Sequence, residues 1–423
     1  MRPKAPWTRW PYRPTWSDCH ESAAAGSRRG GAPAWRRLFL AHYGPTLSGE
    51  QHRALRAIAV CRTAALGGHI TQCDHCGYEV QAYNSCRHRC CPKCHGPAQA
   101  AWLAAREREV LETPYVHVIF TLPHALSALA LQNPRHLYGL LFRTVAQTLQ
   151  DIAGDPKHLG AEIGGFAVLH TWGQQLHHHP HLHCVLPAGG LAAHGARWVP
   201  CRPHFFLPVR VLSRRFRHLY VAGLAQTYAQ GQLTFTGRCR ALTEPAPWQR
   251  LLATLRDQEW VVYAKEPIQD PQHVLQYLAR YAHRIAIANH RLVALEHGQV
   301  TFRYKDYQRG HRLRTLTLDA MEFLRRLLLH VPPHGFHRLR HFGFLANRVR
   351  QAKLAQCRAL LGQATRLPPR ETAVDLKTSE VTKGEPGSVC PVCQHGRLQL
   401  VHTVYRQPAV WDLSLPAPGL DTS

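Results

Sequence analysis

The order of apolar and polar positions along the chain predicts helices interspersed with short, largely buried strands. Ser48 and Gln51 form a capping-box pattern, which predicts a helix over 51–65. Apolar residues at helical spacing predict further helices over 97–111, 135–152, 214–230, 271–289 and 319–330. Apolar runs predict strands over 116–122, 165–172, 181–186 and 260–264, and a hairpin joining 300–307 to 313–318. The mixture indicates an α+β fold.

A chain of 423 residues is too long for one comfortable hydrophobic core, so several segments are expected. Composition predicts a disordered basic arm rich in Pro and Trp, a cysteine-rich helical module, a main α+β domain, a basic helical segment and a flexible tail. Their predicted bounds are 1–34, 35–110, 111–330, 331–364 and 365–423.

The charge balance narrows the class of partner. The chain has 52 Lys and Arg against 26 Asp and Glu, a formal net charge of +26. Such a surplus favours a polyanion, because each neutralised phosphate releases condensed counterions. A membrane surface is the alternative, but the sequence shows no basic amphipathic helix, lipidation motif, signal peptide or long apolar span. We therefore expect a cytoplasmic protein that binds nucleic acid.

Six cysteines lie between residues 73 and 94, within Cys73-Asp-His-Cys76 and Cys86-Arg-His-Arg-Cys90-Cys91-Pro-Lys-Cys94. Two CxxC pairs at this spacing are typical of a structural, zinc-ribbon-like Zn²⁺ site. The simplest site uses Cys73, Cys76, Cys91 and Cys94, while Cys86 and Cys90, with His69 and His88, either complete a second site or line the first. Cys61 is interpreted as a plain thiol. Cys390-Pro-Val-Cys393 is interpreted as half a zinc knuckle, closed by His395 and His402, or as a free dithiol.

A histidine cluster, His177-His-His-Pro-His181-Leu-His183, suggests a second kind of metal centre. On a strand His181 and His183 point to the same face, about 7 Å apart, and can hold one divalent ion with open coordination positions. The third ligand is taken as His179, with Gln174 and His170 as alternatives. A solvated histidine loop remains the alternative interpretation.

A predicted helix carries Tyr277 and Tyr281 four residues apart, so both phenols share a face, with Arg284 one turn beyond. A tyrosyl oxygen can attack a phosphodiester when nearby cations offset the phosphate charge. Core tyrosines are the alternative. Farther on, Arg338, Arg340, Arg348 and Arg350 alternate with phenylalanines, a pattern that suits single-stranded nucleic acid or, equally, an amphipathic helix with buried rings.

Together these segments resemble the rolling-circle transposases of the insertion-sequence 91 family, within the HUH class of nucleases. The resemblance runs in order through about 35–350 and includes His179-Pro-His-Leu-His183, Tyr277-Leu-Ala-Arg-Tyr281 and Arg340-His-Phe-Gly-Phe-Leu-Ala-Asn347. One departure is Cys90, where the family pattern has His.

The resemblance implies an N-terminal zinc-binding domain followed by an HUH nuclease domain, an antiparallel sheet flanked by helices with the His-x-His strand at its centre. It further implies that His181 and His183 ligate a catalytic Mg²⁺ or Mn²⁺ and that Tyr277 and Tyr281 are nucleophiles. The expected partners are single-stranded DNA at transposon ends, target DNA and host replication machinery in a bacterial nucleoid. A replication initiator, a relaxase or a non-catalytic zinc-ribbon protein are the competing hypotheses.

Overall fold

The computed structural model describes residues 34–94, 103, 107, 109–269, 285–307, 310–363 and 386–406. It divides into two compact units. Unit 1 contains residues 1–94, 288–325 and 380–423, and unit 2 contains residues 95–287 and 326–379. The structure groups residues 288–325, which the sequence prediction placed in the main domain, with the cysteine module.

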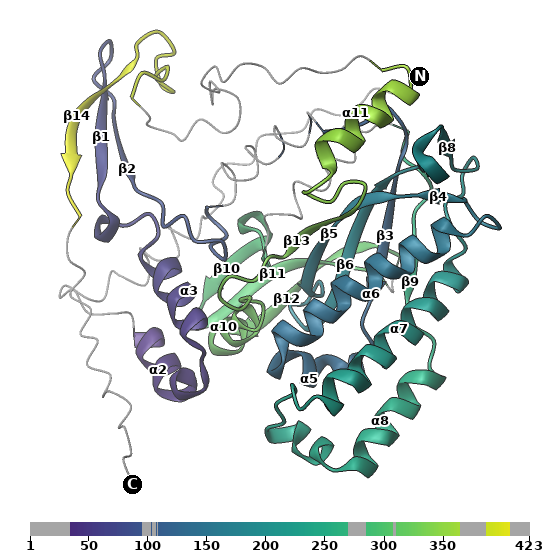
Figure 1. Cartoon of the computed structure of the whole chain (residues 1–423). Helices are drawn as coiled ribbons and strands as arrows, with labels where there is room; N and C mark the ends of the chain where they lie inside the picture. The colour runs from purple at the N-terminus through teal and green to yellow at the C-terminus, as the bar shows by residue number, and fades with distance from the viewer. Residues whose placement is uncertain are drawn as a thin grey trace, which may run out of the picture. The chain divides into compact units, whose positions relative to one another are not determined.

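Unit 2 is built on a five-stranded antiparallel sheet (Figure 1). Its strands, in spatial order, are β13 (Leu339–Gly343), β5 (Gly164–Trp172), β6 (His178–Pro187), β3 (Tyr115–Thr121) and β9 (Val262–Ala264). The four predicted strands are confirmed, and the His-x-His strand β6 is central as expected. Its neighbours set the register, since His183 lies opposite Val168 of β5 and Ile119 of β3.

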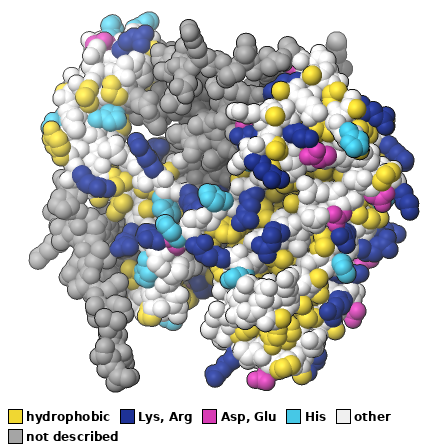
Figure 2. All heavy atoms as spheres, viewed as in Figure 1, with side chains coloured by type: hydrophobic (Ala, Val, Ile, Leu, Met, Phe, Trp, Pro, Cys, Tyr) yellow, Lys and Arg dark blue, Asp and Glu magenta, His cyan; other side chains and the backbone are white. Residues whose placement is uncertain are grey.

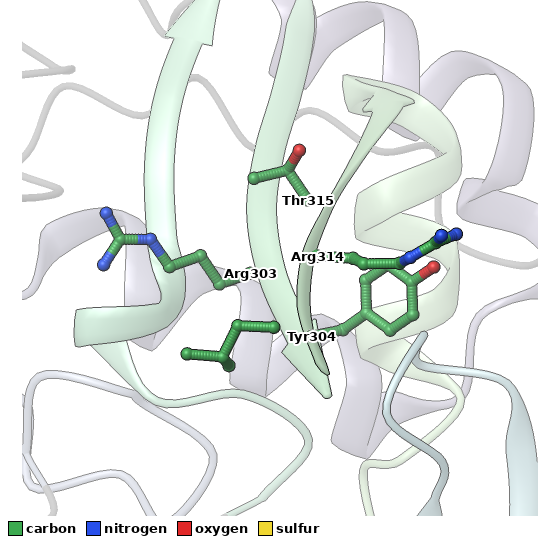
Figure 3. A pocket seen from close by; sticks show the side chains of 5 residues that line it. Arg303, Tyr304, Arg314 and Thr315 are labelled. Atoms are coloured by element: carbon green, nitrogen blue, oxygen red, sulfur yellow. The ribbon is translucent and has the colours of Figure 1, made fainter. Parts of the chain in front are cut away.

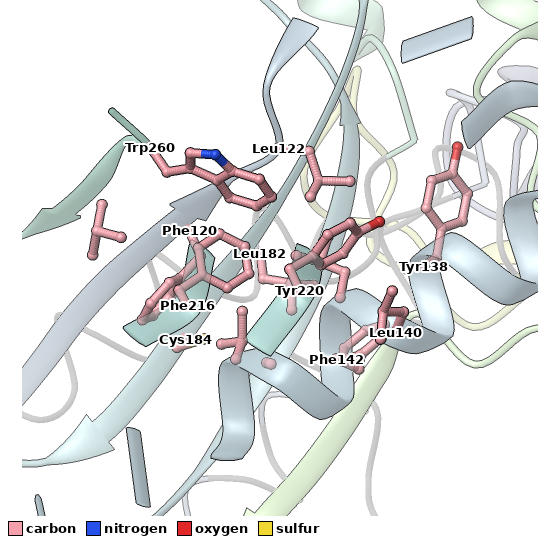
Figure 4. Close-up of a cluster of buried hydrophobic side chains, with 14 of the residues drawn as sticks. Phe120, Leu122, Tyr138, Leu140, Phe142, Leu182, Cys184, Phe216, Tyr220 and Trp260 are labelled. Carbon is pink, nitrogen blue, oxygen red and sulfur yellow. The ribbon is translucent and has the colours of Figure 1, made fainter. Parts of the chain in front are cut away.

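One face of this sheet packs against helices α6 (Pro134–Gly154) and α7 (Val209–Ala229) (Figure 1). Leu182 and Cys184 of β6 point into this core, where Phe120, Phe216 and Trp260 pack around them (Figure 4). The rings of Phe120 and Phe216 meet edge to face at 5.3 Å. Side chains on a strand alternate between faces, so His181 and His183 project from the opposite face. The apolar core thereby fixes which face carries the histidines.

The remaining elements of unit 2 surround this framework. They are α5 (Ser127–Gln132), α8 (Pro245–Asp257), α11 (Arg350–Leu360) and a small antiparallel sheet of β4 (Ala161–Glu162), β7 (Gly189–Ala192) and β8 (Trp198–Pro200). The prediction of a wholly helical segment over 331–364 is wrong, because β13 forms an edge of the main sheet before α11 begins. Pairing with β5 explains the difference. Without β13, strand β5 would be the edge of the sheet with unpaired backbone N–H and C=O groups, and an extended segment can pair with them.

Unit 1 starts with α2 (Ala34–Tyr43) and α3 (Gly49–Val60). The predicted capping box at Ser48 is confirmed, because the Ser48 hydroxyl accepts from Gln51 N–H and the Gln51 side chain accepts from Ser48 N–H. A three-stranded sheet follows, in the order β14 (Leu398–Val404), β1 (Gly68–Cys73) and β2 (Glu79–Tyr83). The prediction of a flexible tail is wrong for residues 386–406, since β14 pairs along the whole of β1.

A second part of unit 1 is a meander of β10 (Leu292–Glu296), β11 (Gln299–Asp306) and β12 (Arg312–Asp319). Helix α10 (Ala320–Leu328) follows, and the division between the units falls within it, after Arg325. The predicted hairpin and the helix after it are confirmed. Short 3₁₀ turns connect elements in both units, at Gly44–Thr46, Ala64–Leu66, His124–Leu126, Ala193–Gly195, Gly237–Thr243 and Asn289–Arg291. Within the described ranges, no helix combines the length and apolar character needed to cross a bilayer.

Several predicted elements fall partly or wholly outside the described residues. The arm 1–33 and most of the predicted helix 97–111 are among them. Of the predicted helix 271–289, residues 271–284 are outside, and the described residues 285–288 are not helical. The predicted end of that helix at Asn289 is therefore wrong.

Candidate metal centres

Three histidines converge on the sheet face opposite the helices. His170 of β5 lies directly opposite His181 of β6, and His183 follows two residues later on the same face. One ring nitrogen from each of the three histidines lies within 4.8 Å of the others. His170 and His183 are buried, whereas His181 is partly exposed. Of the three, His181 is therefore the one that solvent reaches.

Two hydrogen bonds orient these rings. His181 Nδ1 lies 2.7 Å from the carbonyl oxygen of His179, so Nδ1–H donates and Nε2 is left as the ligating nitrogen. His183 Nδ1 lies 2.8 Å from Nε2 of His117, a buried residue of β3 whose ring stacks on that of His183. If His183 Nδ1–H donates to His117, Nε2 of His183 is the metal ligand. Partners of this kind typically fix the tautomer of metal-binding histidines.

Burial keeps these imidazoles neutral. Loss of solvation lowers the pKa of His181 to about 4 and that of His183 well below its ordinary value. Burial, with a smaller contribution from Lys265, lowers the pKa of His117 to about 4. Neutral imidazole is the form that binds metal, so the group is in a ligand-ready state at pH 7.

The structure brings His170, not the predicted third ligand His179, together with His181 and His183. His179 instead supplies the backbone carbonyl that orients His181. His170 was an alternative from the sequence. His170 lies next to His181 because of the register between β5 and β6, and this register could not be read from the sequence.

The kinds of ligand atom in the three-histidine group indicate which metal ion it suits. Three imidazoles and no carboxylate make up the group among the described His, Cys, Asp and Glu residues. Imidazole suits transition metals, whereas Mg²⁺ prefers oxygen ligands and retains several waters. The residues thus fit a divalent transition ion better than Mg²⁺, and of the two predicted ions Mn²⁺ is the one that belongs to the transition series. The predicted nucleophiles Tyr277 and Tyr281, and Arg284, lie outside the described residues.

The first cysteine cluster contains Cys61, Cys86, Cys91 and Cys94, whose sulfurs all lie within 4.8 Å of one another. The Sγ atoms of Cys61 and Cys94 are 3.3 Å apart, and those of Cys86 and Cys94 are 3.6 Å apart. Disulfide sulfurs would be about 2.05 Å apart, whereas Zn–S bonds of about 2.3 Å in a tetrahedron separate sulfurs by roughly 3.8 Å. Contacts from Cys86 and Cys91 lower the pKa of Cys61 to about 7. The geometry supports zinc binding.

The predicted grouping of Cys73, Cys76, Cys91 and Cys94 is wrong. Cys91 and Cys94 join Cys61 and Cys86, while Cys73 and Cys76 lie with Cys390 and Cys393. The interpretation of Cys61 as a plain thiol is also wrong, because it follows directly on α3 and reaches into the first cluster. Cys90 is buried outside both clusters, and its N–H donates to Nδ1 of His88. Cys61 belongs to no CxxC pair, so nothing in the sequence indicated that it joins this cluster.

The predicted DNA-binding arginines serve partly structural roles. The guanidinium of Arg340 lies 4.4 Å from the ring centroid of Phe142 and 5.2 Å from that of Phe336. Arg350 pairs with Glu109 at 3.3 Å, Arg338 lies 6.0 Å from the Trp172 ring centroid, and Arg348 is exposed. Phe336, Phe342 and Phe344 are buried. The interleaved rings therefore pack inward, as the second interpretation expected, but Phe342 lies on strand β13 and none of the three lies on a helix.

A basic hollow that the sequence did not single out lies on the β11–β12 hairpin of unit 1. It has a volume of about 480 Å³ and is lined by Arg303, Tyr304, Leu313, Arg314 and Thr315 (Figure 3). The ring of Tyr304 lies beside Arg314, its cross-strand partner. Lys and Arg side chains also recur over the face shown in Figure 2, where Asp and Glu are fewer. Cations beside an aromatic ring are typical of single-strand binding surfaces.

Known protein families match both the cysteine-containing region and the region that carries the histidine group. A family described as "Transposase zinc-binding domain" matches residues 34–122, and one described as "Putative transposase" matches residues 164–353. The chain is 52% identical over 375 residues to "Putative transposase y4qJ" of Sinorhizobium fredii (strain NBRC 101917 / NGR234), spanning 87% of this chain and 94% of that relative. It is 32% identical over 295 residues, 68% of each protein, to the transposase for insertion sequence element IS801 of Pseudomonas savastanoi pv. phaseolicola. No solved structure matches.

The antiparallel sheet with its histidine centre, the cysteine clusters and these relatives define the class as zinc-binding transposases. Within that class, the chain belongs to the insertion-sequence 91 family.

Proposed function

We propose that this transposase nicks and rejoins single-stranded DNA at the ends of its mobile element through a 5′-phosphotyrosine intermediate, the chemistry of rolling-circle transposition. The observation that carries the proposal is the convergence of His170, His181 and His183 on the central strands of the sheet, with ring nitrogens within 4.8 Å of one another. A structural zinc site would have four protein ligands, whereas three ligands leave positions open for substrate oxygens.

His170, His181 and His183 would hold the divalent ion, with His117 and the His179 carbonyl orienting the rings. When bound, the ion supplies charge neutralisation and alignment of the scissile phosphate. The sheet supports this role because apolar packing behind β6 fixes the positions of its outward side chains. The chain itself thus contributes a preorganised, neutral and mostly buried donor set.

The proposed reaction exchanges one phosphate ester for another. The phenolic oxygen of Tyr277 or Tyr281 attacks phosphorus, the new Tyr–O–P bond forms, and the bond to the 3′ oxygen breaks. The phenolic proton is lost and the departing oxygen gains one as a 3′-OH, so protons balance and no nucleotide cofactor is consumed. Attack by a 3′-OH on the phosphotyrosine reverses the step and rejoins DNA. Arg284, one helical turn beyond in the sequence pattern, is proposed to offset phosphate charge.

Binding of the strand is assigned to the basic surfaces. Tyr304 and Arg314 lie side by side on one side of the β11–β12 hairpin, and Arg303 extends to the other side (Figure 3). Each side thus offers a cation to a phosphate, and the Tyr304 side also offers a ring on which a base can stack. Of the arginines predicted from sequence, Arg348 is exposed and Arg338 lies next to Trp172, so these two are the better candidates for DNA contact. The net charge of +26 supports the same class of partner.

The test is a covalent-adduct assay. The full chain is incubated with Mn²⁺ or Mg²⁺ and labelled single-stranded DNA from the element's ends, then resolved on a denaturing gel. We expect a DNA–protein adduct with the wild type, more with Mn²⁺ than with Mg²⁺, and none with the Tyr277→Phe/Tyr281→Phe double variant. Tyr263→Phe, which alters an exposed tyrosine of β9, is the matched control and should retain the adduct.

The competing functions give different results in the same assay. A non-catalytic zinc-ribbon protein would form no adduct with any DNA. A replication initiator or relaxase would form the adduct on an origin sequence and not on the element's ends. An undiminished adduct in the double tyrosine variant would overturn the proposed nucleophiles.

A further inference from the structure

We propose that Cys73, Cys76, Cys390 and Cys393 hold a second zinc ion, which fastens the C-terminal hairpin 386–406 to the N-terminal module. The four sulfurs lie within 4.8 Å of one another although the two pairs are more than three hundred residues apart in sequence. The matched zinc-binding family covers residues 34–122 and so contains only the first pair. This inference is independent of the cleavage chemistry.

The sulfur spacing is that of a metal site. Cys73 Sγ lies 3.6 Å from Cys393 Sγ, and Cys76 Sγ lies 3.7 Å from Cys390 Sγ. A tetrahedral ZnS₄ site with Zn–S bonds of about 2.3 Å has sulfur–sulfur edges of roughly 3.8 Å. A disulfide would bring two sulfurs to about 2.05 Å. Both observed separations therefore match an edge of the zinc tetrahedron and exclude a disulfide at either contact.

Both CxxC segments have the turn geometry of a zinc knuckle. In each, the N–H of the residue after the second cysteine donates to the carbonyl of the first, from Gly77 to Cys73 at 3.1 Å and from Gln394 to Cys390 at 3.0 Å. Gly77 and Gln394 both have positive φ, 71° and 57°. The two segments are thus local copies of one turn, each aiming two thiols at the same point.

Backbone N–H groups also point at the sulfurs. His75 N and Cys76 N each lie 3.4 Å from Cys73 Sγ, and Gly396 N lies 3.4 Å from Cys393 Sγ. Donors in this arrangement favour the thiolate, which is the form that binds zinc. Backbone N–H groups thus approach a sulfur on each segment, two at Cys73 and one at Cys393.

The contact between the two segments is close and specific. Asp74 and Arg397 form two hydrogen bonds: Asp74 N–H donates to the Arg397 carbonyl at 3.1 Å, and Arg397 N–H donates to the Asp74 carboxylate Oδ1 at 2.8 Å. A Cβ at Gly396 would lie 2.5 Å from Cys73 Sγ and 2.6 Å from Asp74 Oδ1. A glycine is therefore needed for the C-terminal turn to approach this closely.

Hydrophobic burial contributes little to holding the hairpin 386–406 against the N-terminal module. The buried residues here are Cys73, Cys390 and Leu398, with Val80 and Cys393 against them. Most other side chains of β14 are exposed. Small elements with so little apolar burial commonly depend on a metal. Closing a loop of this length also costs entropy, which a bound ion would offset.

The first test is metal content. We expect two zinc ions per wild-type chain by elemental mass spectrometry and one in the Cys390→Ser/Cys393→Ser variant. Cys201→Ser, a cysteine outside both clusters, is the matched control and should retain two. One zinc ion in the wild type, or two in the double variant, would overturn the proposal.

A second measurement distinguishes loss of the ion from general misfolding. Cys393→His replaces one zinc ligand by another and should retain two zinc ions, while Cys393→Ala should lose one. Hydrogen exchange should show loss of protection in Leu398–Val404 for Cys393→Ala and none for Cys393→His, with the amides of β5 and β6 unchanged in both. Unchanged protection of β14 in a chain that has lost one zinc ion would refute the fastening role.

Discussion

His117 is expected to control how tightly the three-histidine group binds its ion, although it is not itself in that group. Binding through Nε2 of His183 requires the proton on Nδ1, which then donates to Nε2 of His117 across 2.8 Å. Both side chains are buried, so water does not readily replace the acceptor. His117→Leu removes it and leaves His183 without this orienting bond.

The magnitude follows from the cost of that lost acceptor. A buried donor deprived of its partner costs about 1–3 kcal/mol. Converted at 1.4 kcal/mol per factor of ten, this weakens the metal affinity by roughly 5- to 150-fold, in line with the range seen for orienting partners of metal ligands. His117→Gln, whose amide oxygen can accept the same bond, should recover most of the affinity.

Titration calorimetry with Mn²⁺ measures the effect on the full chain. His341→Ala is the matched control, since His341 is on β13 of the same sheet but outside the histidine group. Thermal unfolding of each variant in EDTA separates a loss of metal affinity from a loss of fold. If His117→Leu binds Mn²⁺ as tightly as the wild type, the orienting role is refuted.

Three further predictions address other parts of the chain. Cys61→Ser should lower the zinc content by one ion per chain, measured by elemental analysis, and an unchanged content would remove Cys61 from the first cluster. Burial lowers the pKa of His330 to about 4 from an ordinary 6.5, so its contribution to folding is complete above pH 6.5 and is lost as pH falls toward 4. At 1.36 kcal/mol per unit this loss is at most about 3 kcal/mol, and denaturant unfolding of His330→Gln should show a correspondingly flatter pH dependence. Arg303→Ala/Arg314→Ala should weaken single-stranded DNA binding and reduce the slope of log K against log salt by roughly 1.4, whereas a slope equal to the wild type's would exclude these arginines from phosphate contact.

Local signals were enough for much of the secondary structure. The capping box at Ser48 placed the start of α3, because that motif is satisfied within four residues. The strand carrying His181 and His183 was identified from its alternation and apolar run, and it is the centre of the sheet as the family resemblance implied. Where the sequence prediction was wrong, as for β13 and β14, the segment is extended because a partner strand supplies its hydrogen bonds.

The sequence by itself determined the chemistry available to this protein: thiols in CxxC pairs, a His-x-His strand, a strongly basic surface and membership of a transposase family. Only the tertiary structure decided which of these groups meet. Strand register brought His170 to His181 and His183 and set His117 beside His183. Chain folding divided the cysteines between two clusters and carried Cys390 and Cys393 back to Cys73 and Cys76. The physical reason is that a sequence motif contains only residues close together along the chain, whereas a metal site is formed by residues close together in space.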